Sequence, residues 1–364
     1  MNVKSIAGLI ILLVVAGGAV LFTQLDLDEV QRKEPDKKAP VTISLFFGGE
    51  KKAFLANPQV QEILKNRYAI TLDSHSAGSI EMVTTLNTAD KHCVWPSNQV
   101  AVEFAKNSGK TVLSDDNIFN SPIVFYTWDK VADALIAAGI VEIRDKVHYV
   151  VDTRKLIQMI IDGKKWKEDL NLNVYGSIKI FSTDPRKSNS GNMWSGLLAN
   201  LLNNGDVVTA ETIAPILPQI KAYFKAMGHM EHSSGDIFEN FLSQGMGSRP
   251  IIVGYENQLV EFVLANPDNA DFIRQKIRVL YPEPTVYSSH PLISLRSECK
   301  RLATALQDQE LQDIAWVQHG FRTGLLGVQN DPSVLTVTGI PSSVDLVIPM
   351  PRATEMQAII DALE

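Results

Sequence analysis

The sequence predicts an α/β protein with largely parallel sheets, on three observations. Short apolar segments rich in β-branched residues alternate with amphipathic segments along almost the whole chain after residue 41. The 364 residues are 45% hydrophobic and 21% charged, so they can build a large buried core and exceed one small domain. With 2 cysteines and 22 glycines, the chain is neither a disulfide scaffold nor a collagen-like repeat.

The first 25 residues form a separate apolar segment. Residues 5–25 carry no charged side chain, and about 21 residues at 1.5 Å each span roughly 30 Å, the thickness of a bilayer core. Lys4 precedes this segment and Asp26 follows it. This charge pattern predicts that the N-terminus lies on the cytoplasmic side of the membrane and that the rest of the chain is exported. We therefore expect an uncleaved membrane anchor at 1–25. A removed signal segment, cleaved near Ala16-Gly17-Gly18, is the alternative.

Residues 26–40 form a charged linker. They carry side chains of both signs and include Pro35 and Pro40, a composition that cannot bury a core and is typical of a solvated stalk. The net charge of −7 lies almost entirely on the exported part from Val41 onward. An acidic body argues against nucleic acid as a partner, because nucleic-acid binders present a basic patch or stripe.

The exported part contains a series of predicted strands and helices. Residues 41–47 alternate and end at a glycine pair, so they predict a strand; Asn57 and Pro58 are typical of a helix start. Ser233 with Asp236 forms a capping pattern ahead of another helix. Strands are expected at 41–47, 68–72, 93–95, 123–126, 178–181, 250–253 and 279–281. Helices are expected at 58–67, from about 80, and at 131–138, 154–162, 193–202, 213–226, 237–244, 297–318 (broken near Asp308) and 353–363.

Three loops rich in glycine and serine follow predicted strands. They cover residues 48–50, 76–79 and 188–191. Open α/β sheets bind ligands at the carboxyl ends of their strands, where helix N-termini offer free N–H groups. Serine hydroxyls add neutral donors, so the loops favour an anion or another small polar solute. Ordinary caps and turns are the alternative interpretation.

Several stretches, in this order, resemble one protein family. They are Leu45-Phe-Phe-Gly-Gly-Glu50, Ser76-Ala-Gly-Ser79, Val94-Trp-Pro-Ser97, Asn120-Ser-Pro-Ile-Val124, Thr183-Asp-Pro-Arg-Lys-Ser-Asn-Ser-Gly191, Val253-Gly-Tyr-Glu256, Val279-Leu-Tyr-Pro282 and His290-Pro-Leu292. From Val41 to its end, the chain resembles bacterial extracellular solute-binding proteins with the type 2 periplasmic-binding fold, in the branch that binds molybdate, sulfate and phosphate. The full basic complement and the glycine-rich signature of phosphate binders are missing, although Arg186 and Lys187 lie near one loop.

This resemblance implies two lobes, each a mixed, mostly parallel sheet flanked by helices, with the solute held between them. Residues 120–124 and 280–286 would cross between the lobes. Lobe I would comprise 41–122 and 284–364, and lobe II 123–283. The family's cleft positions correspond here to Gly48, Gly49, Ser76, Gly78, Ser79, Ser97, Ser121, Ser188, Asn189, Ser190 and Tyr255.

The function expected from these features is not enzymatic. An exported, membrane-tethered solute-binding protein would close on a small polar solute, with an oxyanion favoured, and would serve an ABC-type transporter. One alternative is a tethered sensor or an assembly partner of another membrane complex. Another is an exported hydrolase built on Asp73, His75 and Ser76. No cofactor is expected, and a metal pair at His229 and His232 is disfavoured against a polar helix end.

The two cysteines would both lie in lobe I. Export permits a bond between Cys93 and Cys299, but Cys93 lies in an apolar strand and is expected to act as a small buried hydrophobe. The sequence leaves the bond open. His290, beside Pro291, is expected to be structural.

Overall fold

One long strand, β4 (Ser114–Trp128), organises the sheet of this protein. The structure is a computed structural model in which residues 39–364 are described, so the predicted anchor and nearly all of the predicted linker lie outside the described residues. The first part of β4 pairs with β9 (Tyr287–Ser294), up to the Pro122–Tyr287 pair. From Ile123, which faces Tyr255, the strand pairs with β7 and then with β8. β4 therefore changes partners within the segment that the resemblance predicts as the first crossover.

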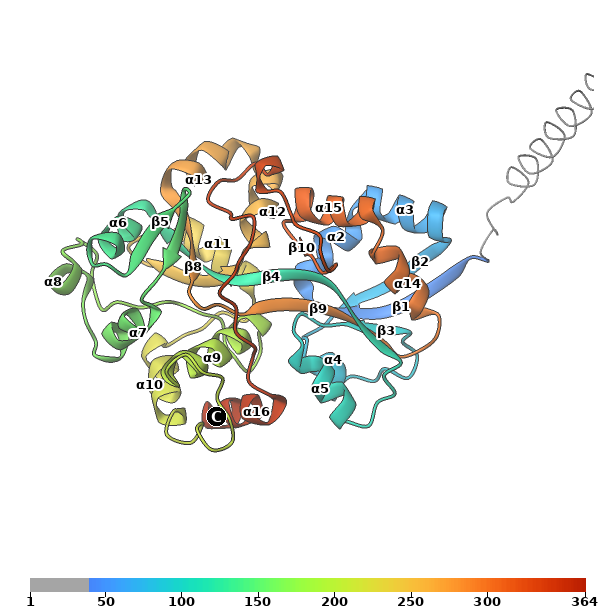
Figure 1. Ribbon diagram of the computed structural model, residues 1–364, viewed down its shortest axis with the longest axis horizontal. Helices are drawn as coiled ribbons and strands as arrows, with labels where there is room; N and C mark the ends of the chain where they lie inside the picture. Colours follow the sequence, from blue (N-terminus) through green and yellow to red (C-terminus); the bar gives the residue numbers. More distant parts are fainter. Residues whose placement is uncertain (1–38) are drawn as a thin grey trace, which may run out of the picture. The chain divides into compact units, whose positions relative to one another are not determined.

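The strands form one mixed sheet. Their order is β2 (Ile70–Ser76), β1 (Val41–Phe47), β3 (Cys93–Trp95), β9, β4, β8 (Ile277–Pro282), β6 (Val147–Val150) and β5 (Val141–Arg144), while β7 (Ile251–Tyr255) and β10 (Arg322–Thr323) also pair with β4. The predicted parallel pairing holds for β1 with β3 and for β6 with β8. Pairing is antiparallel along β4, between β3 and β9, and in the β5–β6 hairpin (Figure 1).

The elements before β4 form the first part of predicted lobe I. Strands β1 and β3 have the bounds that the sequence predicts, and Asn57 Oδ1 accepts a hydrogen bond from Gln59 N at 3.0 Å, as expected of the cap of α3. β2 continues to Ser76, so part of the predicted loop 74–79 belongs to a strand. The helices here are η1 (Gly49–Lys51), α2 (Lys52–Ala56), α3 (Pro58–Tyr68), α4 (Glu81–Thr84) and α5 (Val100–Asn107).

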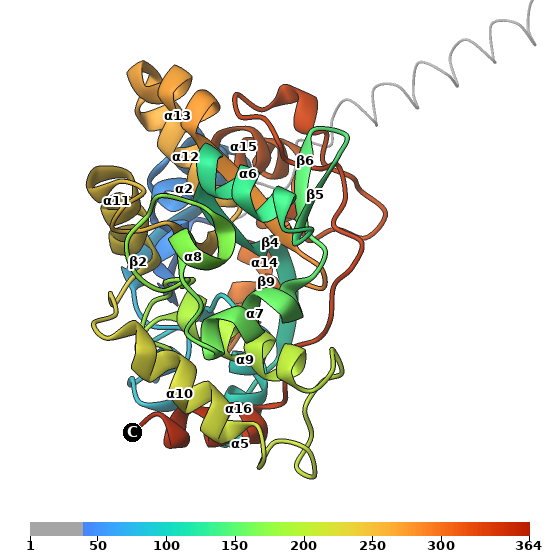
Figure 2. The same cartoon turned by 90° about the vertical axis from the view of Figure 1, so that its left-hand side faces the viewer.

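The elements between β4 and β8 contain most of the described helices. The β5–β6 hairpin and α6 to α8 lie at the end of the sheet far from β1 (Figure 2). The predicted cap of α11 is confirmed, since Ser233 Oγ accepts from Asp236 N at 3.1 Å. The helices are α6 (Asp129–Ala137), α7 (Thr153–Ile161), α8 (Trp166–Leu170), α9 (Asn189–Leu202), α10 (Leu217–Met227), α11 (Ser234–Gln244), α12 (Asn257–Ala265), η2 (Pro267–Asn269) and α13 (Ala270–Lys276).

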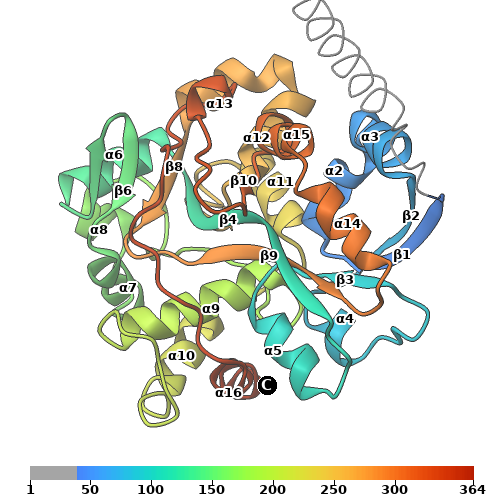
Figure 3. The same cartoon turned by 45° about the vertical axis from the view of Figure 1, so that its right-hand side comes forward.

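The chain after β9 returns to the first half of the sheet and then leaves it again. The predicted helix break near Asp308 separates α14 (Cys299–Leu306) from α15 (Gln309–His319), and a segment containing η3 (Pro332–Val334) leads to α16 (Ala353–Ala362). α16 packs against α9, α10 and α5 (Figure 3). The predicted lobe boundaries place all of this segment in lobe I. α16 contacts helices from both predicted lobes, and the boundaries stay a prediction.

A buried ion pair attaches this C-terminal segment to the centre of the molecule. Arg322 Nε and Nη2 donate to the two carboxylate oxygens of Glu256 at 2.7 and 2.8 Å, and the Tyr281 hydroxyl donates to the same carboxylate at 2.5 Å. The guanidinium also donates to the carbonyls of Pro341 and Ser342 at 2.7 and 3.0 Å. Burial alone would lower the pKa of Arg322, but the charge of Glu256 raises it.

One predicted strand is wrong and several elements are unforeseen. Residues 178–181 are predicted as a strand, but in the described chain only Phe181 forms a bridge, to Ile252 of β7. Ile178 and Ile180 are packed in the core without a ladder, and Lys179 is partly exposed. The sequence patterns also did not predict β5, β6, β9, α5 or α12.

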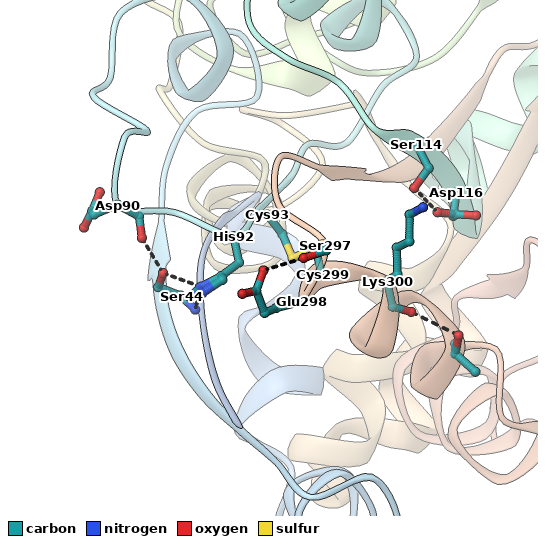
Figure 4. Close-up of a disulfide and its surroundings, with 11 residues drawn as sticks. Ser44, Asp90, His92, Cys93, Ser114, Asp116, Ser297, Glu298, Cys299 and Lys300 are labelled. Atoms are coloured by element: carbon teal, nitrogen blue, oxygen red, sulfur yellow. Dashed lines mark hydrogen bonds between the residues drawn. A yellow bond between two sulfur atoms is a disulfide. The ribbon is translucent and has the colours of Figure 1, made fainter. Parts of the chain in front are cut away.

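The two cysteines are joined by a disulfide, which corrects the expectation of a free buried Cys93. The bond links Cys93 of β3 to Cys299, the first residue of α14, with 5.7 Å between their Cα atoms (Figure 4). Both cysteines are fully buried. Next to the bond, Ser44 N donates to His92 Nδ1 at 3.0 Å and Ser44 Oγ donates to Asp90 O at 2.8 Å. The disulfide therefore links β3 covalently to α14, with a separation of 206 positions between the two cysteines along the chain.

Residues 39–364 include no helix with the length and apolarity needed to cross a membrane. The predicted anchor lies outside this range.

Candidate functional site

The main cleft has a volume of about 790 Å³ and collects the ends of several strands. Its walls come from five short segments, all of which the sequence places next to the start of a helix. They are residues 48–56 after β1, 76–79 after β2, 187–189 before α9, 232–235 before α11, and 255–261 at the β7–α12 junction. Because helix N-termini and strand ends meet here, the cleft is rich in backbone N–H groups and small polar side chains.

The structure brings most of the predicted site residues together. Those that line the cleft are Gly48, Gly49, Ser76, Gly78, Ser79, Ser188, Asn189 and Tyr255. The three glycine- and serine-rich loops, separated by up to 140 positions along the chain (48–188), therefore form one surface. This arrangement supports the interpretation of the loops as parts of a single site.

The other three predicted residues lie behind the cleft wall and hold it in place. Ser97 is fully buried, and its N–H donates to Ser79 Oγ at 2.9 Å. Ser121 Oγ donates to Asn257 Oδ1 at 3.1 Å. Ser190 Oγ lies 2.8 Å from Thr183 Oγ1. Each of these serines positions a residue or loop of the wall, and no described contact places them in the cleft itself.

Asn189 connects the two sides of the cleft. From predicted lobe II, its side chain reaches predicted lobe I, where Nδ2 donates to Ser97 O at 3.1 Å and Oδ1 accepts from Asn98 Nδ2. Nδ2 also donates to the Tyr255 hydroxyl at 2.9 Å. The Tyr255 pKa is raised well above its usual value, by burial first and also by the charge of Glu50. Tyr255 therefore stays a neutral phenol at physiological pH.

The N-terminus of α9 contributes a positive potential to the cleft wall. Ser188 occupies the cap position, but its side chain makes no capping bond in the described chain and lies 3.2 Å from Ser190 Oγ instead. A Cβ on Gly191 would meet Thr183 O at 2.3 Å, so only glycine lets this helix start so close to the preceding loop. Lys187, which lines the cleft, places Nζ 3.2 Å from His232 Nε2. A helix dipole and a lysine together favour an anionic group here.

A buried charged cluster lies beneath the cleft wall at residues 48–50. Lys51 is fully buried, and its Nζ donates to Glu50 Oε1 at 2.5 Å, to Ser97 Oγ at 3.0 Å and to His290 Nδ1 at 3.0 Å. Burial lowers the pKa of Lys51, and it lowers the pKa of His290 to about 4. Burial alone would raise the pKa of Glu50, but the neighbouring Lys51 charge and His290 lower it strongly. The cluster therefore holds a carboxylate at the edge of the cleft.

Sequence reasoning missed several residues of this site. Glu50 lies in the predicted loop 48–50 but is not among the predicted site residues. The sequence patterns assign no binding role to Lys187. Asn257, Gln258 and Glu261 also line the cleft. They follow the Val253-Gly-Tyr-Glu256 stretch directly, so a helix predicted from that stretch would have pointed to them. The burial of Lys51 had no sequence signal, because lysine is rarely buried.

The structure separates the residues of the hydrolase alternative. The side chains of His75 and Asp73 are 60% and 54% exposed, and His75 Nδ1 lies 3.8 Å from Asp73 Oδ1. Ser76 lines the cleft beside Gly49. No hydrogen bond in the described chain joins Ser76 to His75, so these residues do not form a nucleophile and base pair there.

The described residues offer no ready metal site. Within residues 39–364, no group of three or more His, Cys, Asp or Glu side chains could hold a metal ion. Glu231, which the sequence places between His229 and His232, instead accepts from Arg249 Nη2 at 2.8 Å.

Comparisons with known proteins identify the class of fold. No family model matches the chain, and no curated protein matches it. Iron-bound HitA from Pseudomonas aeruginosa is similar over 89% of this chain and 99% of its own, with a TM-score of 0.60 and 11% identity. The sulfate-binding protein SubI from Mycobacterium tuberculosis H37Rv is similar over 81% of this chain and 88% of its own, with a TM-score of 0.51 and 13% identity. A protein described as a two-component system protein that mediates signal transduction is similar over 89% of this chain and 100% of its own, with a TM-score of 0.53 and 10% identity.

At such identities, these likenesses show the fold alone. The described chain has the fold of the type 2 periplasmic solute-binding proteins, as the resemblance in the sequence predicts.

Proposed function

We propose that this protein is an exported solute-binding protein that closes two lobes on a small polar or anionic solute. The observation that carries the proposal is the 790 Å³ cleft, in which three predicted loops from both predicted lobes meet. Neutral donors and one helix N-terminus suit a small polar or anionic ligand that is held without a full countercharge. The fold is shared with a sulfate-binding and an iron-bound protein, which supports binding over catalysis.

The proposal includes a membrane tether and a membrane partner. The apolar segment 5–25 anchors the chain in the cytoplasmic membrane, and the linker 26–40 leaves the body on the outer side. The solute passes from the body to an ABC-type transporter. A protease-accessibility experiment on intact cells tests the topology, because an N-terminus inside and a body outside predict cleavage of the body alone.

Ligand binding has a direct test. A thermal-shift screen of the purified body against inorganic anions, amino acids and sugars should give at least one hit, because a ligand that binds the native state stabilises it. Small-angle scattering with that hit should show compaction, since closure brings the lobes together. A screen in which no solute raises the melting temperature would contradict the proposal.

A second candidate function keeps the fold and changes its output. A permanent tether suits a sensor, and the likeness to a signal-transduction protein supports this alternative at the level of fold. In that case a stable membrane partner other than a transporter should co-purify with the full chain after mild cross-linking. Capture of transporter subunits would favour the uptake function instead.

A further inference from the structure

Two carboxylates face the cleft with one oxygen each unoccupied. Glu50 Oε1 accepts bonds from Lys51 and Ser97, while Oε2 has no hydrogen-bond partner among residues 39–364 and the side chain keeps 11% of its surface exposed. Glu261 Oε1 contacts His319 Nδ1 at 2.9 Å, and its Oε2 is likewise without a partner in the described chain. Both residues line the cleft, one from each predicted lobe.

These carboxylates lie within each other's electrostatic field. The pKa of Glu261 is raised, by burial first and also by the negative charge of Glu50. Two neighbouring carboxylates repel each other, and a cation placed between them removes that repulsion. These two carboxylates therefore favour a positively charged group in the cleft.

A buried amide beside them also lacks a partner. Asn257 is 1% exposed, and its Oδ1 accepts from Ser121 while Nδ2 has no partner within the described residues. If the amide of Asn257 is turned so that Nδ2 and Oδ1 exchange places, Oδ1 becomes the unpaired atom. One polar atom of this side chain therefore lacks a partner in either orientation of the amide. An unpaired buried polar group costs free energy, and a polar solute in the cleft would relieve that cost.

Another part of the wall of the same cleft carries the opposite charge. There, Lys187 and the uncapped N-terminus of α9 favour an anionic head, as described above. The cleft wall therefore carries groups of both signs, with backbone donors and Lys187 at the start of α9 and carboxylates at Glu50 and Glu261.

We propose that the solute is a zwitterion, whose anionic head lies at the α9 N-terminus and whose ammonium group binds Glu50 and Glu261. This inference rests on the proposed function and narrows its ligand class. A free anion would meet the field of a protein with a net charge of −7 and two carboxylates at close range. A zwitterion carries no net charge, so it escapes that repulsion and can pair with wall groups of both signs.

Three matched pairs of probes test the proposal on the wild-type protein. β-Alanine and propionate, taurine and ethanesulfonate, and 2-aminoethylphosphonate and ethylphosphonate share their anionic heads and differ in the amine. Thermal shift identifies the binders, and titration calorimetry measures their affinity, with inorganic sulfate as an anion without an amine. We expect at least one aminated probe to bind at least tenfold more tightly than its partner.

Two variants and a control assign the ammonium site. Glu50→Gln removes the negative charge at the cleft and should weaken the best aminated probe at least tenfold, with little effect on its deaminated partner. Glu50→Gln leaves Lys51 buried without its counterion, so Glu261→Gln provides a second test that spares the cluster. Glu62→Gln, on the exposed face of α3, removes the same charge outside the cleft and should leave binding unchanged.

The outcomes separate this inference from the proposed function. If sulfate or a deaminated probe binds as tightly as the aminated probes, the protein is a solute-binding protein and the zwitterion inference is wrong. The inference also fails if both glutamine variants bind the aminated probe as the wild type does. If neither these probes nor the wider screen of anions, amino acids and sugars gives any binding, the proposed function fails with it.

Discussion

Removing one partner of the buried Arg322–Glu256 pair should destabilise the protein strongly. In Arg322→Met, the carboxylate of Glu256, itself 1% exposed, keeps one hydrogen bond, from Tyr281. In Glu256→Gln, the guanidinium keeps the two backbone carbonyls but loses its counterion. A buried charge left without its partner costs about 3–5 kcal/mol. Each single variant should therefore lose about that much free energy of unfolding.

The melting temperature translates this loss into an assay. Unfolding entropy of about 2.1 cal/mol/K per residue gives about 0.7 kcal/mol/K for a body of about 320 residues. A loss of about 3–5 kcal/mol then lowers the melting temperature by about 4–7 °C. Calorimetry on the purified body measures the shift. It should be nearly the same at low and high salt, because buried pairs are weakly screened.

The double variant and a surface control make the reasoning refutable. Glu256→Gln with Arg322→Met leaves neither charge, so it should lose clearly less than the sum of the two single losses. Arg67, whose side chain is 48% exposed, pairs with Asp308 at 2.7 Å on the surface, and Arg67→Met should cost much less stability than either core variant. Additive losses in the double variant, or single losses as small as that of the control, would refute the argument.

Three further predictions concern other features of the described chain. Replacing both Cys93 and Cys299 by alanine should cost about 2–5 kcal/mol of stability in calorimetry, and a reductant should then shift the wild type while leaving the variant unchanged. The pKa of His290 falls from 6.5 to about 4 on folding, so the unfolded chain takes up a proton first as the pH falls. Stability should therefore drop by up to about 3 kcal/mol between about pH 6.5 and 4, and a His290→Gln variant whose pH profile matches the wild type would contradict this. Asn189→Ala removes two bonds across the cleft, each worth about 1 kcal/mol, and should shift the balance toward open lobes by roughly tenfold or more. Small-angle scattering of the ligand-free body should then show a larger radius than in the wild type or in Asn66→Ala, and equal radii would count against this role.

The sequence predicted those parts of the fold that depend on local signals. Strands β1 and β3 have their predicted bounds, and the caps at Asn57 and Ser233 act on the residues expected. The loops at the strand ends meet in one cleft because the architecture brings those ends to one region, a property that follows from the α/β pattern.

The missing parts depend on partners that are distant in sequence. The first four residues of β4 read Ser-Asp-Asp-Asn, with no apolar alternation, and they form a strand because β9 pairs with them. The acid and base at Glu50 and Lys51 look like surface charges. They are buried because Ser97 and His290 supply their hydrogen bonds from positions up to 239 residues away. The disulfide depends in the same way on packing that brings β3 to α14.

The first half of the sheet combines strands from two distant parts of the sequence, β1 to β3 and β9, and this has a consequence for biosynthesis. On a chain that is made from its N-terminus, β3 emerges long before β9, and Val94 of β3 pairs with Ile293 of β9. Predicted lobe II is continuous in sequence and can close its own ladder in the meantime. The edge of β3 that pairs with β9 and the thiol of Cys93 therefore stay unpaired until β9 and Cys299 have been synthesised. A chain that ends before residue 287 should consequently need a chaperone to cover that edge, whereas the full-length protein should not.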